Sequence, residues 1–108
     1  MTNKDRRLIV SQIKTTPRNK ILITHGTYTM VETAEHLGKL YLKKTIVLTG
    51  AFIPGTDKNT NALLNLEYAM NALENLKNGI YIVMNGEIFN WNNVRKNLSE
   101  NRFEPLTH

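Results

Sequence analysis

Apolar residues occur along the chain in two patterns, short continuous runs and longer stretches with helical spacing. The short runs, residues 21–24 (ILIT), 45–49 (TIVLT) and 80–85 (IYIVMN), predict three strands. An uninterrupted apolar run of this length is typical of a strand buried on both faces, as in a parallel sheet. The three runs therefore predict the central layer of the fold.

The longer stretches have apolar residues three or four positions apart and predict three helices. They cover residues 2–15, residues 30–42, and a stretch from residue 59 or 60 to about 77. Thr29, followed by Glu32, has the spacing of an N-cap for the second helix. The apolar faces expected to be buried are Leu8, Ile9 and Ile13 in the first helix, Met30, Ala34, Leu37 and Tyr41 in the second, and Ala62, Leu66, Ala69, Leu73 and Leu76 in the third.

The elements alternate as helix, strand, helix, strand, helix, strand, and a tail without clean periodicity begins at Gly86. Such alternation implies an α/β fold in which parallel strands are joined by right-handed helical crossovers. We expect the tail to contain a strand continuation, a turn and a loop. Because the 108 residues include no repeat or linker, we expect a single domain over residues 1–108.

Composition and charge narrow the function classes. The absence of cysteine excludes disulfides and thiolate metal sites and suits a reducing compartment, so we expect a cytoplasmic protein. No apolar run reaches the roughly 20 residues of a membrane span, so no membrane partner is expected. The net charge is +5, but the basic residues are scattered and do not interleave with aromatic ones. We therefore favour a solvated basic surface over nucleic-acid binding.

Small and hydroxyl residues follow all three predicted strands, at residues 24–27 (THGT), 49–51 (TGA) and 84–87 (MNGE). Any one of these ends is explained by a tight turn. In a parallel sheet, however, the carboxyl ends of the strands meet at one edge, which is where ligands bind in such folds. The three ends together therefore predict a small-molecule site at that edge.

Two side chains invite catalytic roles. His25 could act as a general base, although an inward-packed histidine that holds a backbone carbonyl is the favoured reading. Lys96 could deprotonate a threonine hydroxyl if its pKa were lowered, whereas most lysines in a polar tail are simply solvated. No histidine pair has HxxxH spacing, and neither GxGxxG nor GxxxxGK[ST] occurs, so neither a metal nor a nucleotide cofactor is expected.

Four segments together resemble one known family. They are residues 23–37 (ITHGTYTMVETAEHL), 45–54 (TIVLTGAFIP), 61–73 (NALLNLEYAMNAL) and 79–97 (GIYIVMNGEIFNWNNVRKN). The chain resembles the N-terminal domain of bacterial-type L-asparaginases over residues 2–97, and is most similar to the short, single-domain asparaginase-like proteins. The motifs HGTxTM and VLTGAxxP at this spacing are specific in combination.

The resemblance implies a three-layer α/β/α fold with a flavodoxin-like parallel sheet. It also implies hydrolysis of a small-molecule substrate, L-asparagine or a similar amino acid, to the acid and ammonia without a cofactor. In this sequence Thr27 matches a catalytic threonine of the family, and Lys96 matches the lysine that works with it. Gly26 and Ala51 would lie along the wall of the substrate pocket, where Tyr28 would also contact the substrate.

Two departures from the family pattern bear on activity. Tyr28 stands where the family has an aspartate that holds the α-amino group of the substrate, and tyrosine is normally uncharged at neutral pH. The TGGTI segment, with a second reactive threonine on the first strand of the family's sheet, has no counterpart here. The implied protein is thus an amidohydrolase domain with weak or no turnover alone, or a non-catalytic remnant that binds a small amino acid. Without the family's first strand, the neighbouring strand would have an exposed edge, and covering this edge would favour a homo-oligomer.

Overall fold

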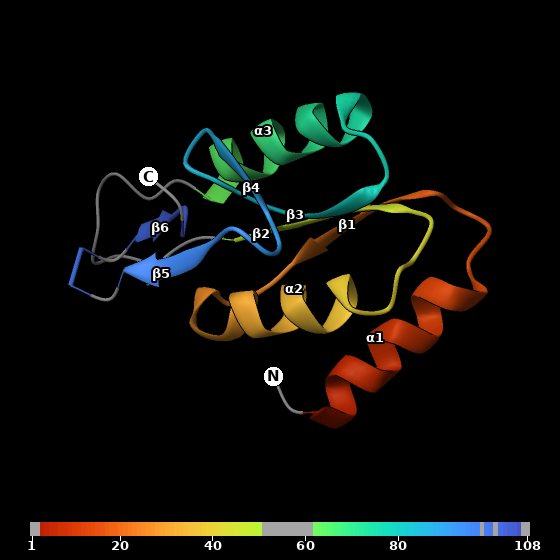
Figure 1. Cartoon of the computed structure of the whole chain (residues 1–108). Coiled ribbons are helices and arrows are strands. Elements are labelled where there is room, and N and C mark those ends of the chain that lie inside the picture. The colour runs from red at the N-terminus through yellow and green to blue at the C-terminus, as the bar shows by residue number, and fades with distance from the viewer. Residues whose placement is uncertain (1–2, 51–61, 98, 101, 107–108) are drawn as a thin grey trace.

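The computed structural model describes residues 3–50, 62–97, 99–100 and 102–106. The predicted start of the third helix lies outside these residues. Figure 1 shows the elements in chain order: α1 (Asn3–Thr15), β1 (Lys20–Thr24), the short 3₁₀ helix η1 (Thr27–Thr29), α2 (Met30–Gly38), β2 (Thr45–Thr49), α3 (Ala62–Asn75), β3 (Gly79–Met84), β4 (Glu87–Asn90), β5 (Arg95–Asn97) and β6 (Arg102–Glu104).

Four strands form the main sheet in the order β1-β2-β3-β4. β1 pairs with β2, and β2 with β3, in parallel, which confirms the expectation from the alternating elements. β4 pairs with β3 in the antiparallel direction, so the sheet is mixed. Asn85 and Gly86 join these two strands with φ values of 51° and 78°, as a two-residue hairpin turn requires. The tail therefore begins as a strand that turns back along β3.

Helices cover both faces of this sheet, which confirms the predicted three-layer α/β/α arrangement (Figure 1). Side chains alternate between the two faces of each strand. Ile46 and Leu48 accordingly pack in the core beneath α1 and α2, whereas Val47 packs against α3. β2 is buried along its whole length, and β1, at the edge of the sheet, is only half-buried in its middle.

The second helix ends at Gly38 and not at residue 42 as predicted. A Cβ at Gly38 would lie 2.2 Å from the Trp91 ring, so this ring packs directly on the backbone of the helix end. The chain then turns, and Tyr41, with φ of 53°, is exposed instead of joining the buried face. Thr29 is the N-cap residue of α2 as predicted, but it makes no side-chain capping hydrogen bond where η1 runs directly into α2.

The first helix ends where predicted. There the Lys44 ammonium donates to the carbonyls of Ile13 and Thr16, both at 2.7 Å, and a cation is favoured at this end of a helix. Ile13 is buried and Ile9 is half-buried, but Leu8 is exposed, which contradicts its predicted burial. On α3, Ala69 is fully buried, Leu66, Leu73 and Leu76 are half-buried, and the side chain of Ala62 lies outside the described part.

The end of the tail forms a second, two-stranded sheet of β5 and β6, where a loop was expected. Val94 and Phe103, each 3% exposed, anchor this hairpin in the core shared with α1 and α2. On its surface the Glu104 carboxylate forms ion pairs with Arg95 and Arg102. Apolar anchoring and paired charges together explain a sheet that the sequence periodicity does not reveal.

Glu104 is expected to ionise at a lower pH than an ordinary glutamate. The Asn97 amide, which donates to Oε2 at 3.3 Å, and the Arg95 guanidinium hold the pKa of this carboxyl below its usual value of 4.5. Because the folded-state pKa is the lower one, the stabilising contribution is present above pH 4.5 and is lost as the pH falls through the folded-state pKa. In an NMR titration the carboxyl carbon should show a midpoint below 4.5, which Asn97→Ala should raise. A midpoint at or above 4.5 would contradict this expectation.

Candidate functional site

Hydrogen bonds join the carboxyl ends of β1, β2 and β3 at one edge of the sheet. The backbone N–H of His25 donates to the Thr49 carbonyl at 2.9 Å, and the Thr49 hydroxyl donates to the Val83 carbonyl at 2.7 Å. At Gly50 a Cβ would lie 2.2 Å from the His25 carbonyl oxygen, so only glycine permits the ends of β1 and β2 to approach this closely. The polar strand ends predicted to form a site are therefore brought together.

Asn65 fixes two of these ends from α3. Its side-chain N–H donates to the Gly50 carbonyl at 2.8 Å, and its side-chain carbonyl accepts the Asn85 N–H at 3.0 Å. The residue is 5% exposed. Sequence reasoning missed Asn65, although it lies three residues after Ala62 and four before Ala69, on the buried face of the helix. A polar residue on such a face was the signal that could have identified it.

Thr27 and Lys96 are 69 residues apart in sequence and lie next to each other in space. Thr27 is the first residue of η1 and is buried, and Lys96 is half-buried on β5. The Lys96 Nζ is 3.4 Å from the Thr27 Oγ1, slightly longer than a usual N–H···O hydrogen bond. An ammonium at this place donates to the hydroxyl, whereas a neutral amine would accept its proton. The pair thus has the arrangement of a hydroxyl nucleophile beside a base.

Tyr28 projects outward beside this pair. The residue is 84% exposed, and the Lys96 Nζ lies 5.6 Å from the centre of its ring. At this distance the ring face attracts the ammonium. Tyr28 therefore helps to hold Lys96 near Thr27, and a tyrosine side chain supplies no carboxylate for the α-amino group of an amino acid.

His25 is a buried structural residue. Its Nδ1 lies 2.6 Å from the Gly26 carbonyl oxygen, and its Nε2 lies 2.9 Å from the Thr33 hydroxyl. Because a carbonyl can only accept, we assign the ring proton to Nδ1, and Nε2 then accepts from Thr33. The Arg6 Nε of α1 donates to the same Thr33 oxygen at 2.9 Å. The favoured reading of His25 is confirmed, and both of its ring nitrogens are engaged away from Thr27.

A hollow of about 610 Å³ opens at this edge of the sheet. Gly26 lies on its wall with an extended backbone, and a Cβ there would meet nothing within 4 Å. Thr27 and Lys96 are not among its lining residues, and Ala51, the second wall residue implied by the resemblance, lies outside the described residues. Among the described residues, those that line it are Thr24, His25, Gly26, Thr49, Gly50, Leu63 and Leu66.

The chemical groups that the described residues bring together here are a threonine hydroxyl, a lysine amine and a phenol ring. Within the described ranges, no group of three or more histidine or acidic side chains is placed to hold a metal ion. None of the helices that the structure describes is long and apolar enough to cross a membrane. The layers and the site define an α/β domain with a polar site at the carboxyl edge of its sheet.

Comparison with known proteins identifies the family. A family model described as asparaginase, N-terminal, matches residues 1–104. A probable periplasmic L-asparaginase of Haemophilus influenzae is 36% identical over an alignment of 94 residues, and the match covers 83% of this chain and 26% of that protein. A glutaminase-asparaginase of Acinetobacter glutaminasificans is 34% identical over an alignment of 97 residues, and the match covers 86% of this chain and 29% of that protein. The chain belongs to the asparaginase family and corresponds to its N-terminal domain.

Solved structures agree with this assignment. L-asparaginase I from Vibrio cholerae superposes with a TM-score of 0.77 at 30% identity, covering 90% of this chain and 31% of the other. The thermostable L-asparaginase from Thermococcus kodakarensis gives a TM-score of 0.71 at 27% identity, covering 94% of this chain and 32% of the other. The chain thus spans between 26% and 32% of the length of these relatives.

Proposed function

We propose that this chain is an asparaginase-type amidohydrolase domain that supplies a threonine–lysine pair for hydrolysis of L-asparagine to aspartate and ammonia. The contact between the Lys96 Nζ and the Thr27 Oγ1 carries the proposal. The names of the relatives support the substrate class, since they are L-asparaginases and glutaminase-asparaginases. We expect turnover by the chain alone to be weak but measurable, because the sequence has no TGGTI segment to provide a second reactive threonine.

In the proposed reaction, Lys96 in its neutral form takes the proton of the Thr27 hydroxyl. The hydroxyl oxygen attacks the amide carbon of the substrate, the carbon–nitrogen bond breaks, and ammonia leaves with the proton returned by Lys96. Water then hydrolyses the ester on Thr27 to release the acid. The hydrogen bonds of His25 to Gly26 and Thr33 hold the turn that presents Thr27, so they position the nucleophile without touching the substrate.

A second candidate function is binding of a small amino acid without turnover. Tyr28 favours this binding function for two reasons. Its exposed ring attracts the Lys96 ammonium, and residue 28 therefore supplies a ring where the family has a carboxylate. A charged Lys96 stabilises a bound carboxylate or carbonyl oxygen, but it cannot accept the Thr27 proton. The two functions therefore differ in the protonation state of one amine.

We also propose that the protein is a cytoplasmic homo-oligomer. The absence of cysteine supports the compartment. Tyr68 of α3 and Ile88 of β4, which are 41% and 44% exposed and line a common hollow, support an apolar contact between copies. Sedimentation analysis tests the assembly, and a monomer at every concentration would contradict it. Cell fractionation tests the compartment.

The experiment that tests the function is release of ammonia from L-asparagine by the purified chain, beside Thr27→Val and Lys96→Gln. Thr29→Val is the matched control, since Thr29 lies in the same 3₁₀ helix and makes no capping bond. Turnover that both site variants abolish and the control keeps is the result expected of a hydrolase. Thermal stabilisation by L-asparagine that needs Thr27, with no ammonia, would assign the binding function. If L-asparagine causes neither ammonia release nor thermal stabilisation, both candidate functions are overturned.

A further inference from the structure

Asn-Gly pairs lie at both ends of β3, Asn78–Gly79 where the strand begins and Asn85–Gly86 directly after it. In such a pair the glycine nitrogen can attack the side-chain amide carbon of the asparagine, because glycine has no Cβ to obstruct the approach. The attack requires an asparagine side chain that can turn toward the backbone and a glycine N–H that is not already engaged. The surroundings of the two pairs therefore decide which of them reacts.

Asn85 and Gly86 form the exposed turn between β3 and β4. Met84 pairs with Glu87 across this turn, so the Gly86 N–H lies outside the ladder of the hairpin. Among the described residues, neither the Gly86 N–H nor the Asn85 side chain has a hydrogen-bond partner. Both groups that would react are therefore available in the folded protein.

The Asn78–Gly79 pair is held by hydrogen bonds. The Gly79 N–H donates to the Lys44 carbonyl at 2.9 Å, so the nitrogen that would attack is engaged. The Asn78 side-chain carbonyl accepts from the Thr45 hydroxyl at 3.2 Å, so the amide that would be attacked is engaged too. Both bonds must break before this pair can react.

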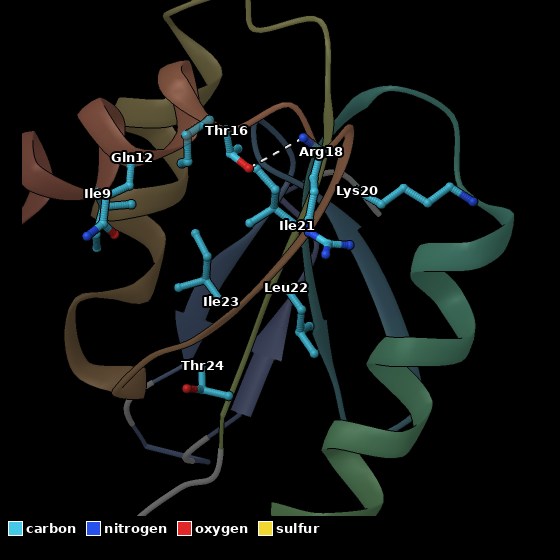
Figure 2. A pocket seen from close by; sticks show the side chains of 10 residues that line it. Ile9, Gln12, Thr16, Arg18, Lys20, Ile21, Leu22, Ile23 and Thr24 are labelled. Atoms are coloured by element: carbon cyan, nitrogen blue, oxygen red, sulfur yellow. Dashed lines mark hydrogen bonds between the residues drawn. The ribbon is translucent and has the colours of Figure 1, made fainter.

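The chain that leads to Asn78 is also tied to the sheet. The Tyr81 hydroxyl donates to the Lys77 carbonyl at 3.0 Å. The Lys20 ammonium donates to the Glu74 carbonyl, also at 3.0 Å, and Figure 2 shows the Lys20 side chain extending from β1 toward the end of α3. These contacts restrict the local movement that Asn78 would need.

We propose that Asn85 is a site of spontaneous deamidation in the folded protein, and that its isoaspartyl product loses the hydrogen bond with Asn65. The Gly86 nitrogen gives up its proton and bonds to the Asn85 Cγ, the side-chain carbon–nitrogen bond breaks, and ammonia leaves with that proton. Water then opens the cyclic imide. Opening at the side-chain carbonyl gives aspartate, whereas opening at the backbone carbonyl gives isoaspartate, in which the chain continues through the former side chain.

Isoaspartate places an additional methylene group in the backbone of a turn that has only two residues. The length of such a turn sets the register of its strands, so the turn must rearrange to accommodate the group. The N–H of residue 85, which donates to the Asn65 Oδ1 at 3.0 Å, then moves away from it. Asn65 would keep its bond to Gly50 and lose its hold on the end of β3. The proposal depends neither on Thr27 nor on turnover of L-asparagine.

The first test is incubation of the purified chain in mildly alkaline buffer, followed by peptide mapping with mass spectrometry. Deamidation at Asn85 should be at least about tenfold faster than at Asn78, because the hydrogen bonds of the second pair must break first. In denaturing guanidinium chloride the two pairs should react at similar rates. Equal rates in the folded chain, or a difference of the same size in the denatured chain, would overturn the proposal.

The second test isolates the isoaspartyl chain by ion-exchange chromatography, since the reaction adds a negative charge, and identifies it with an isoaspartate-specific methyltransferase. Asn85→Asp is the matched control, because it adds the same charge and leaves the backbone unchanged. In hydrogen exchange monitored by NMR, the amide of residue 85 should exchange at least about tenfold faster in the isoaspartyl chain than in the control. Formation of aspartate alone, or equal exchange in the two chains, would overturn the loss of the bond with Asn65.

Discussion

Gly50→Ala is expected to lower the free energy of unfolding by about 3 kcal/mol. The new methyl group would lie 2.2 Å from the His25 carbonyl oxygen and 3.3 Å from the Met30 side chain. The closer neighbour is backbone, so no rotamer change can relieve the contact. β1 and β2 would have to separate where the His25 N–H donates to Thr49. Urea denaturation followed by the fluorescence of Trp91, the single tryptophan, measures the change.

Gly26→Ala is the matched control for this substitution. Gly26 lies in the same cluster of strand ends, but its φ of −63° suits any residue, and a Cβ would meet nothing within 4 Å. We expect a small gain in the free energy of unfolding, about 0.4–1 kcal/mol, because the site has room and the added methyl group only restricts the unfolded chain. Equal losses in the two variants would show that close approach at Gly50 is not the cause.

Asn65→Asp is expected to cost roughly 3 kcal/mol at neutral pH. The Asn65 amide N–H that donates to the Gly50 carbonyl would become a carboxylate oxygen, so two acceptors would face each other in a buried place. The other oxygen could still accept the Asn85 N–H. Burial and this repulsion raise the pKa of the new carboxyl, so the loss is largest above that pKa. Below it the protonated group can donate to Gly50, and the difference from the parent chain should shrink.

Urea denaturation of Asn65→Asp and of the parent protein, at neutral pH and near pH 4, gives the difference in their free energies of unfolding at each pH. Asn71→Asp provides the control, since it makes the same chemical change at an exposed position of α3. It should shift stability by less than about 0.5 kcal/mol at either pH. If the loss of stability in Asn65→Asp does not depend on pH, then the fit of the side chain, and not the repulsion between two acceptors, determines the effect.

Much of the fold follows from the sequence because its central strands are buried on both faces and therefore appear as continuous apolar runs. β2 is fully buried, so its apolar run has the boundaries of the strand. The sequence pattern does not separate β4 from the rest of the tail, because its four residues are too few for a clear alternation, although the Asn85–Gly86 pair is a strong hairpin signal. The premature end of α2 depends on the packing of Trp91 on Gly38, a contact across 53 positions that no local pattern contains.

The candidate site follows from the sequence only in part. Convergence of the strand ends is a property of parallel sheets, so the edge could be located from the pattern alone. Lys96 could be paired with Thr27 only through the family resemblance, because β5 belongs to a separate small sheet. Arg6 could not be anticipated, since no local pattern in α1 or α2 indicates that the guanidinium of Arg6 reaches the hydroxyl of Thr33.

The cross-strand partner of Lys96 has a consequence for adaptation of this domain to temperature. Lys96 lies directly opposite Phe103, so the two side chains share one face of the hairpin, and Phe103 reaches the main core. A substitution that loosens the packing of Phe103 would also displace the amine from Thr27. Selection for a firmer core and selection for a well-placed amine would therefore act on the same contact, and the two properties cannot evolve independently at this point of the chain.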